Sequence, residues 1–459
     1  MQPRTVVKWS LLGVALLAIA GVAVTYAAYS RGRYLGPPDD GTPVALVGGR
    51  IYDLETDSLI EDVTVLIRGR EIAAAGPWVP LPDSARVIDV RGLTLLPGLI
   101  DSHAHLSGIR TRASDGAREL GWPAYLWRFI RRFPDRRQAL IEAGVTSVKS
   151  LGDPYPWIVN LANRIDRHEL AGPRIFAAGP YLTAPGGYPV TRFRVAGQGD
   201  TSFIAQVTRQ LANPADAATA VKQISGRVDY VTTVLETRGT AHLPRMSPSV
   251  LRSITSTAHD LDLRVLTHVS SVPDVKLALR TGVDGLEHVP FDAEIDSATL
   301  ATLAELGIVV APTLQALEEW LAESLGDTAA ARRARHNTQL MWQSGVPLVA
   351  GSDAPAAGTA FGFTLHEELR NLVEIGYSPG QAIAAATIVA AAHLGIADRL
   401  GTVATGKWAD IIAVGGEPWA HIESAADVYL VIADGRVLYD RLDEYRRRGG
   451  VIAARTNGR

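Results

Sequence analysis

The sequence predicts an α/β protein: a (β/α)8 TIM barrel with a small β-sandwich built from both chain ends, plus an N-terminal transmembrane helix. Three observations support this fold class. Short β-branched runs alternate with helical stretches in the middle of the chain, turn-rich β segments flank them on both sides, and an uncharged run lies near the start. A chain of 459 residues suits one barrel-sized domain with a smaller companion.

The first 33 residues are expected to form a membrane anchor. The uncharged run Trp9–Ser30 would be roughly 33 Å long as a helix at about 1.5 Å per residue, enough to cross the hydrocarbon core. A cleaved signal, giving a secreted protein, is the alternative because Ala27-Ala28 would permit cleavage. A lone N-terminal anchor usually directs export, so the catalytic domain is expected outside the cytoplasm, in the periplasm. Residues 34–43, with Pro-Pro and Asp-Asp-Gly, are expected to be a linker.

Two blocks of short β segments are expected to form one composite sandwich from residues 44–96 and 403–440. Neither block is a convincing domain alone, because isolated hairpins are marginal in water. Their alternating pattern favours a half-buried antiparallel sheet, and residues 441–459 are left as a tail. The predicted strands are Val44–Val47, Thr64–Arg68, Glu71–Ala75, Arg86–Asp89, Asp410–Val414, Val428–Ala433 and Arg436–Tyr439.

The barrel is expected over residues 97–402. Eight strand candidates alternate with helical periodicity, as in Pro248–Asp260 and Val272–Thr281. The candidates are Leu99–Asp101, Thr146–Lys149, Arg174–Ala177, Tyr230–Val234, Arg264–His268, Gly285–His288, Ile308–Ala311 and Leu348–Gly351. In such a barrel, catalytic residues come from the C-terminal ends of the strands.

Composition excludes several classes of site. The formal charge of −3 carries no electrostatic footprint for nucleic acid. With 0 cysteines, the chain has no disulfide, thiolate zinc site or cysteine nucleophile. Any metal ligands must therefore be His, Asp, Glu or a modified Lys.

Polar side chains at four strand ends indicate a metal site. An apolar strand runs into His103 and His105, and residues spaced by two on a strand share one side. His268, His288 and Asp353 follow later strand candidates in the same way. Any one of them alone is more often structural, but together they predict one site. Imidazole and carboxylate ligands suit a divalent metal, with zinc the default and iron or manganese as alternatives.

The ordered motifs PGLIDSHAHL, GVTSV, GPRIFAAG, RVLTHVSS, GLEHVP and VPLVAGSDAP resemble the amidohydrolase superfamily, in particular its imidazolonepropionase-like and prolidase-like branch. The resemblance covers nearly all of residues 44–440, and it implies hydrolysis of a carbon–nitrogen bond. By position, His103 and His105 match the first-strand ligands and His268 the fifth-strand ligand. His288 matches the sixth-strand histidine, and Asp353 the aspartate that binds metal and shuttles protons.

Two departures from the family pattern limit what the resemblance implies. Binuclear members have a carboxylated lysine where this chain has Thr232, so we expect one ion, held by His103, His105, His268 and Asp353, with His288 free to polarise substrate. Lys149 could be carboxylated instead, but an ordinary ion pair is the simpler expectation. After the third strand, relatives often carry histidine where this chain has Tyr188.

The expected substrate is a small cyclic amide or a dipeptide. Tyr188, Arg192, Arg194 and Tyr230 are candidate substrate contacts. Two other classes of function remain open: a degenerate barrel that only binds its ligand, and a hydrolase of esters or phosphoesters. Homo-oligomers are compatible with the sequence. The other histidines match no motif and are expected to be structural or on the surface.

Overall fold

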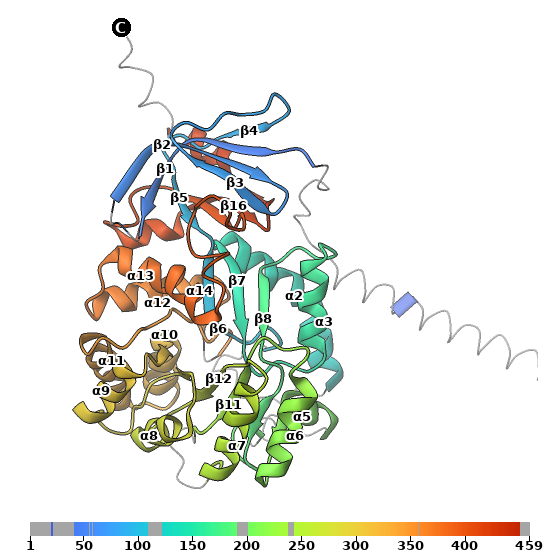
Figure 1. Cartoon of the computed structure of the whole chain (residues 1–459), viewed down its shortest axis with the longest axis vertical. Helices are drawn as coiled ribbons and strands as arrows, with labels where there is room; N and C mark the ends of the chain where they lie inside the picture. The colour runs from blue at the N-terminus through green and yellow to red at the C-terminus, as the bar shows by residue number, and fades with distance from the viewer. Residues whose placement is uncertain are drawn as a thin grey trace, which may run out of the picture.

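The computed structural model describes residues 20–21, 41–54, 56, 58–108, 122–190, 201–236, 243–356 and 358–449. Among these residues, no helix is both long and apolar enough to span a bilayer. The predicted anchor lies outside the described residues except for Ala20 and Gly21. Figure 1 shows two layers, with the β-rich part at the top and the α/β part below it.

The β-rich part is one hydrogen-bonded sheet built from both chain ends. Its strand order is β17-β16-β15-β5-β1-β2-β3, with β4 also pairing β1. The Arg68–Glu71 hairpin turns at Gly69, whose φ of 55° is in the left-handed region that glycine tolerates. The strands are β1 (Val44–Asp53), β2 (Ser58–Arg68), β3 (Glu71–Gly76), β4 (Arg86–Asp89), β5 (Thr94–Pro97), β15 (Ile411–Val414), β16 (Val428–Ala433) and β17 (Arg436–Asp440).

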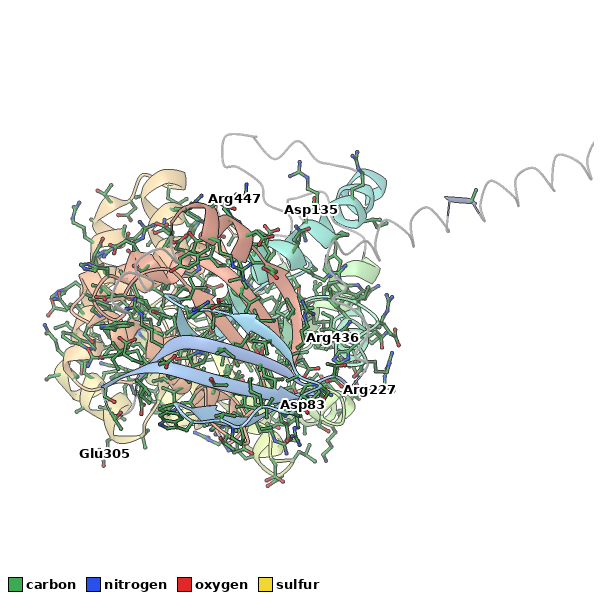
Figure 2. All side chains as sticks on the ribbon, turned by 90° about the horizontal axis from the view of Figure 1, so that it is seen from above. Asp83, Asp135, Arg227, Glu305, Arg436 and Arg447 are labelled. Atoms are coloured by element: carbon green, nitrogen blue, oxygen red, sulfur yellow. The ribbon has the colours of Figure 1, made fainter. Side chains whose placement is uncertain are left out.

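One apolar cluster joins the two halves of this sheet. Val65 and Ile67 of β2 share it with Leu430 and Ile432 of β16, although several strands separate β2 from β16 in the sheet. The sheet must therefore curl, so that both halves bury the same face. The expected antiparallel pairing holds for β1–β2, β2–β3, β5–β15, β15–β16 and β16–β17, whereas β1 pairs in parallel with β4 and β5. In Figure 2, strands from both chain ends lie over the barrel, and Arg227 and Glu305 lie at its periphery.

The predicted TIM-barrel-like α/β domain is confirmed. Parallel strands alternate with helices, and seven of the eight strand candidates are regular strands. The first seven barrel strands are β6 (Leu99–Ala104), β7 (Val145–Ser150), β8 (Arg174–Ala177), β11 (Val231–Val234), β12 (Val265–His268), β13 (Gly285–Glu287) and β14 (Val309–Ala311). Two short extra strands, β9 (Tyr181–Thr183) beside β11 and β10 (Thr208–Gln210) beside β9, extend this sheet.

The eighth position is taken by residues 347–354, which make isolated bridges rather than a full strand. Leu348 bridges Val310 of β14, and Ala354 bridges Ala104 of β6. Gly351 permits this close approach, because a Cβ there would lie 2.7 Å from the Cβ of His103. This segment closes the ring and brings the end of the last strand beside the end of the first.

Helices cover the outside of the barrel, and several begin at the signals that the sequence carries. Ser271 caps α8 in a capping box with Asp274, and Ser247 caps α7 ahead of Pro248. The helices are α2 (Trp122–Glu142), α3 (Trp157–Asp166), α5 (Thr201–Val207), α6 (Pro214–Ile224), α7 (Pro248–His259), α8 (Val272–Thr281), α9 (Ser297–Glu305), α10 (Leu314–Glu318), α11 (Thr328–Gln343), α12 (Phe363–Glu374), α13 (Pro379–Ala385), α14 (Ile388–Leu394) and α15 (Leu442–Arg447), with a π-helix at Glu319–Ser324 and a 3-10 helix at Ile422–Ala426.

The inside of the barrel is filled in layers. An apolar plug of side chains from the strands packs on Ala390 and Ala391 of α14; it includes Ile100, Phe176 and Leu266. On β12, Val265 faces the outer helices, whereas Leu266 and then His268 face inward, as strand alternation requires. The histidines therefore lie above a packed apolar floor.

Candidate active site

All five side chains that the sequence singled out converge at the C-terminal ends of the barrel strands. The ring centroid of His103 lies 5.2 Å from that of His105, 5.1 Å from that of His268 and 4.7 Å from that of His288. Nε2 of His105 lies 2.9 Å from Oδ1 of Asp353. Two groups with metal-ligand spacing result, His103–His268–His288 and His103–His105–Asp353, and they share His103.

Outer hydrogen bonds orient three of the four imidazoles. Nδ1 of His105 donates to the Leu151 carbonyl at 2.5 Å, and Nδ1 of His103 donates to Oε2 of Glu287 at 2.7 Å. Nδ1 of His288 lies 2.7 Å from the Thr313 hydroxyl, which itself donates to a backbone carbonyl and so accepts here. At His103 and His288 this bond uses the Nδ1 proton, so the neutral ring presents the Nε2 lone pair, whereas Nε2 of His105 lies 2.9 Å from Oδ1 of Asp353.

Unusual backbone conformations aim three of the polar side chains. His288, Thr313 and Asp353 have φ values of 67°, 52° and 49° at the ends of three consecutive strand positions. Non-glycine residues rarely adopt this left-handed region, and those that do cluster at functional sites. At β13 the left-handed turn lets two successive residues, Glu287 and His288, both contact the histidine cluster, which plain strand alternation forbids.

Interactions within the cluster favour the ionised form of Asp353 and the neutral form of His268. Burial disfavours ionisation of Asp353, but the hydrogen bond from His105 and the nearby imidazoles hold the pKa of Asp353 well below its ordinary value. Burial and the neighbouring His103 and His288 push the pKa of His268 well below its ordinary value. Near neutral pH the cluster therefore combines an ionised carboxylate with a neutral imidazole at His268.

This donor set fits a divalent metal ion. Nε2 of His103 and Nε2 of His268 are buried, and neither has a hydrogen-bond partner among the described residues. A buried polar atom without a partner is costly and calls for an explanation. An ion among these nitrogens and the Asp353 carboxylate would satisfy both atoms, and imidazole with carboxylate is a donor set that zinc, iron and manganese accept.

Comparison with known proteins decides the family. The sequence model of the Amidohydrolase family matches residues 94–438, about three quarters of the chain. The chain belongs to the amidohydrolase family.

Full-length relatives place this amidohydrolase in a particular branch. It is 25% identical over 402 residues to an imidazolonepropionase of Deinococcus radiodurans, covering 81% of this chain and 92% of the relative. It is 28% identical over 407 residues to an imidazolonepropionase of Pseudomonas putida, covering 81% and 90%. A solved Xaa-Pro dipeptidase with methionine in its active site superposes with a TM-score of 0.74 at 25% identity, covering 86% of this chain and 99% of that one. The amidohydrolase is thus an imidazolonepropionase-like and prolidase-like hydrolase of carbon–nitrogen bonds.

Thr232 of this amidohydrolase is buried on β11, in register with Leu266 of β12. The residue level with His268 is Val234, so Thr232 starts one layer below the histidines. A long lysine side chain could reach the centre from this depth, whereas the short threonine side chain cannot. Nζ of Lys149, the other candidate for carboxylation, lies 2.5 Å from Oε1 of Glu287.

The predicted substrate contacts have different outcomes in the structure. Tyr230 as a substrate contact is wrong: it is buried in the apolar floor, and its hydroxyl donates to the carbonyls of Ser150 and Phe176. Tyr188 is buried in a small cluster with Tyr181, Val234 and Leu243, where its role stays a prediction. Arg192 and Arg194 lie outside the described residues.

Two site residues of the amidohydrolase were missed by sequence reasoning, Glu287 and Tyr181. The Tyr181 hydroxyl lies 3.3 Å from Nδ1 of His105, and its ring packs 5.1 Å from that of His268. Gly152 leaves room for this ring, since a Cβ there would fall inside it. Glu287 directly precedes His288 in the sequence. Because successive side chains of a strand point to opposite faces, the sequence did not indicate that both reach the site. Of the unassigned histidines, His393 is buried, with Nε2 3.5 Å from Nζ of Lys149.

Proposed function

We propose that this protein is a metal-dependent amidohydrolase that cleaves the C–N bond of a small cyclic amide or a dipeptide. The observation that carries the proposal is the convergence of four imidazoles and Asp353 at the mouth of the barrel. The similarity to imidazolonepropionases favours a cyclic amide, and the similarity to an Xaa-Pro dipeptidase favours a dipeptide. Catalysis at this end of the strands is what the barrel architecture favours.

One ion per chain is the second part of the proposal. In the described part of the chain two carboxylates contact the imidazole rings of the cluster, Asp353 and Glu287, and Lys149 already neutralises part of the second charge. Two divalent ions would place four positive charges against this small negative charge. Thr232 supplies no bridging carboxylate. We assign His103, His105, His268 and Asp353 as ligands, zinc as the default ion, and His288 to the substrate.

The residues of this chain would then divide the reaction between them. A divalent ion held here would supply Lewis acidity and lower the pKa of water in the site. Asp353 accepts a proton from the attacking water and delivers it to the leaving nitrogen, so the amide yields a carboxylate and an amine. His288, held by Thr313 at Nδ1, donates from Nε2 to the substrate carbonyl oxygen in its imidazolium form, which has a proton on both ring nitrogens, and stabilises the charge that develops on that oxygen.

A substrate panel with metal analysis tests this function. The full chain is stripped of metal, reloaded with Zn²⁺, Fe²⁺ or Mn²⁺, and assayed with cyclic amides, Xaa-Pro and other dipeptides, esters and phosphoesters. We expect amide hydrolysis that requires reloading, with one tightly bound ion per chain. Turnover of esters or phosphoesters alone would assign a different hydrolase class. Tight ligand binding without turnover of any substrate would make the barrel a binding protein, and two tightly bound ions would overturn the mononuclear assignment.

We further propose that the protein is anchored in a membrane by its N-terminal run, with the catalytic domain outside the cytoplasm. The uncharged stretch Trp9–Ser30 supports this proposal. Fractionation of cells expressing the full chain, with protease added to intact spheroplasts, tests it. Release into the medium after loss of the first 30 or so residues would favour the cleaved-signal alternative.

A further inference from the structure

A fully buried ion pair lies inside the barrel beside the histidine cluster. Lys149 is on β7 and Glu287 on β13, the second and sixth strands of the ring, so their side chains meet across the barrel interior. Nζ of Lys149 is 2.5 Å from Oε1 of Glu287, and each side chain is only 1% exposed. Burying two charges is costly unless both are well paired, so stability alone is a weak reason for this buried pair.

The two oxygens of Glu287 have different partners. Oε1 accepts from Lys149, whereas Oε2 accepts from Nδ1 of His103 at 2.7 Å. A carboxylate that accepts from Nδ1 fixes the imidazole in the tautomer whose Nε2 carries the lone pair. Nε2 of His103 is the buried atom that belongs to both groups with ligand spacing.

Lys149 determines which way Glu287 can turn. Its ammonium group occupies Oε1, so only Oε2 remains for the histidine side. Without that cation the carboxylate would be free to rotate toward the centre and compete with His103 as a ligand. The Lys149 side chain is itself confined, with Nε2 of His393 at 3.5 Å and the Tyr230 ring centroid at 6.0 Å.

We propose that Glu287 is a positioning residue that fixes the ring orientation and tautomer of His103 for metal binding, and that Lys149 holds Glu287 in this role. The inference rests on the metal-dependent function proposed above. It deepens that function by adding to the metal ligands an outer pair, Lys149 and Glu287, whose strands lie on opposite sides of the barrel. A purely structural ion pair would instead affect stability and leave metal affinity unchanged.

Zinc affinity of the full chain tests the role of Glu287. Metal-free protein is titrated with Zn²⁺ against a competing chromophoric chelator, for wild type, Glu287→Gln and the control Asp410→Asn. Asp410 is equally buried but contacts Arg174 at the other end of the strands. We expect Glu287→Gln to bind Zn²⁺ about 10- to 100-fold more weakly, as is typical for loss of an outer partner, and Asp410→Asn to match wild type.

Three further variants keep the test decisive if Glu287→Gln fails to fold. Glu287→Asp keeps the charge but shortens the reach, so it should fold and still bind Zn²⁺ more weakly. Lys149→Arg keeps a cation against Oε1 and should retain most of the affinity, whereas Lys149→Met should lose it. With Co²⁺ as the probe, the visible absorption bands of Glu287→Asp and Lys149→Met should shift, because the geometry of the His103 ligand changes.

The outcomes separate this inference from the proposed function. If the wild-type chain binds neither Zn²⁺ nor Co²⁺, the proposed metal-dependent function fails. If wild type binds tightly and folded Glu287 and Lys149 variants match it within twofold with unchanged Co²⁺ spectra, the positioning role is overturned and the function stands. Weaker binding and shifted spectra confined to the Glu287 variants and Lys149→Met support the positioning role.

Discussion

At the scale of single residues, individual hydrogen bonds orient the side chains of the site. Nδ1 of each of His103, His105 and His288 is engaged outside the centre. Asp101 links the first and last strand positions, because its carboxylate accepts from the Ser352 hydroxyl at 2.6 Å and from the Ser352 backbone N–H at 2.9 Å. Asp353 directly follows Ser352. The bonds from Ser352 to Asp101 therefore fix the backbone that places the Asp353 carboxylate beside His105.

Replacement of Asp353 by asparagine should abolish most turnover while the fold is retained. The amide cannot accept the proton from water, and loss of a positioned acid–base group typically costs about 100- to 10,000-fold in rate. The measurement is kcat on the substrate that the panel identifies, with circular dichroism as the control for folding. Turnover equal to that of wild type would remove Asp353 from its assigned role.

Tyr181→Phe should lower kcat/KM roughly 10- to 100-fold, the range for losing one hydrogen bond to a charged group. The phenol lies beside His105, whose side chain is 20% exposed against 3% for Asp353, so we expect substrate to approach on the side of His105 and Tyr181. Burial raises the pKa of Tyr181 well above its ordinary value, so the hydroxyl stays a donor at neutral pH. The bound metal should be unchanged; a variant as active as wild type would show that the hydroxyl does not meet substrate.

At the scale of elements, one carboxylate on α12 holds the start of α10 in place. Glu368 accepts from the backbone N–H groups of Leu314 and Gln315 at 2.9 and 3.0 Å. Thr313, the residue just before them, orients His288. An outer helix is thereby connected to the site through Thr313 and the first two residues of α10. A carboxylate at a helix N-terminus is favourable, but this one is fully buried.

Stability should depend on pH through Glu368. Burial raises the pKa of Glu368 from 4.5 to about 7. Because the folded state then holds the proton more tightly than the unfolded state, this stabilisation is present below pH 4.5 and is lost as the pH rises through about 7. At about 1.4 kcal/mol per unit, the difference is about 3 kcal/mol in the free energy of unfolding.

Denaturant unfolding of wild type and Glu368→Gln at several pH values measures this contribution. The glutamine variant does not titrate, so its free energy of unfolding should fall less than that of wild type as the pH rises from 4.5 to 7. Parallel curves for the two proteins would mean that Glu368 does not carry the effect.

At the scale of the whole molecule, the site connects strands that are remote in sequence. The ligands assigned above come from the first, fifth and eighth positions of the ring, and the eighth is joined to its neighbours by isolated bridges rather than a long ladder. An ion bound by these side chains would therefore connect the first and eighth positions, where isolated bridges replace a full ladder.

Metal removal should lower the melting temperature of the whole chain. A ligand that binds only the folded state stabilises it by about 2.7 kcal/mol at a free concentration of 100 Kd. Differential scanning calorimetry of the Zn²⁺-loaded protein, with and without excess chelator, measures the change, and restored Zn²⁺ should reverse it. The same melting curve in both conditions would show that no ion is coupled to folding.

The sequence alone determined the alternation of strands and helices, the pairing of the two chain ends and the identity of the five side chains at the strand ends. Those signals are local: periodicity, turn residues and polar groups that end apolar runs. It could not locate Glu287 or Tyr181, and it assigned Tyr230 to the substrate when the phenol is part of the floor. Which face a residue joins depends on neighbours far along the chain. The left-handed conformations of His288, Thr313 and Asp353 were decided only by tertiary structure, because each is imposed by strands and loops that pack around it.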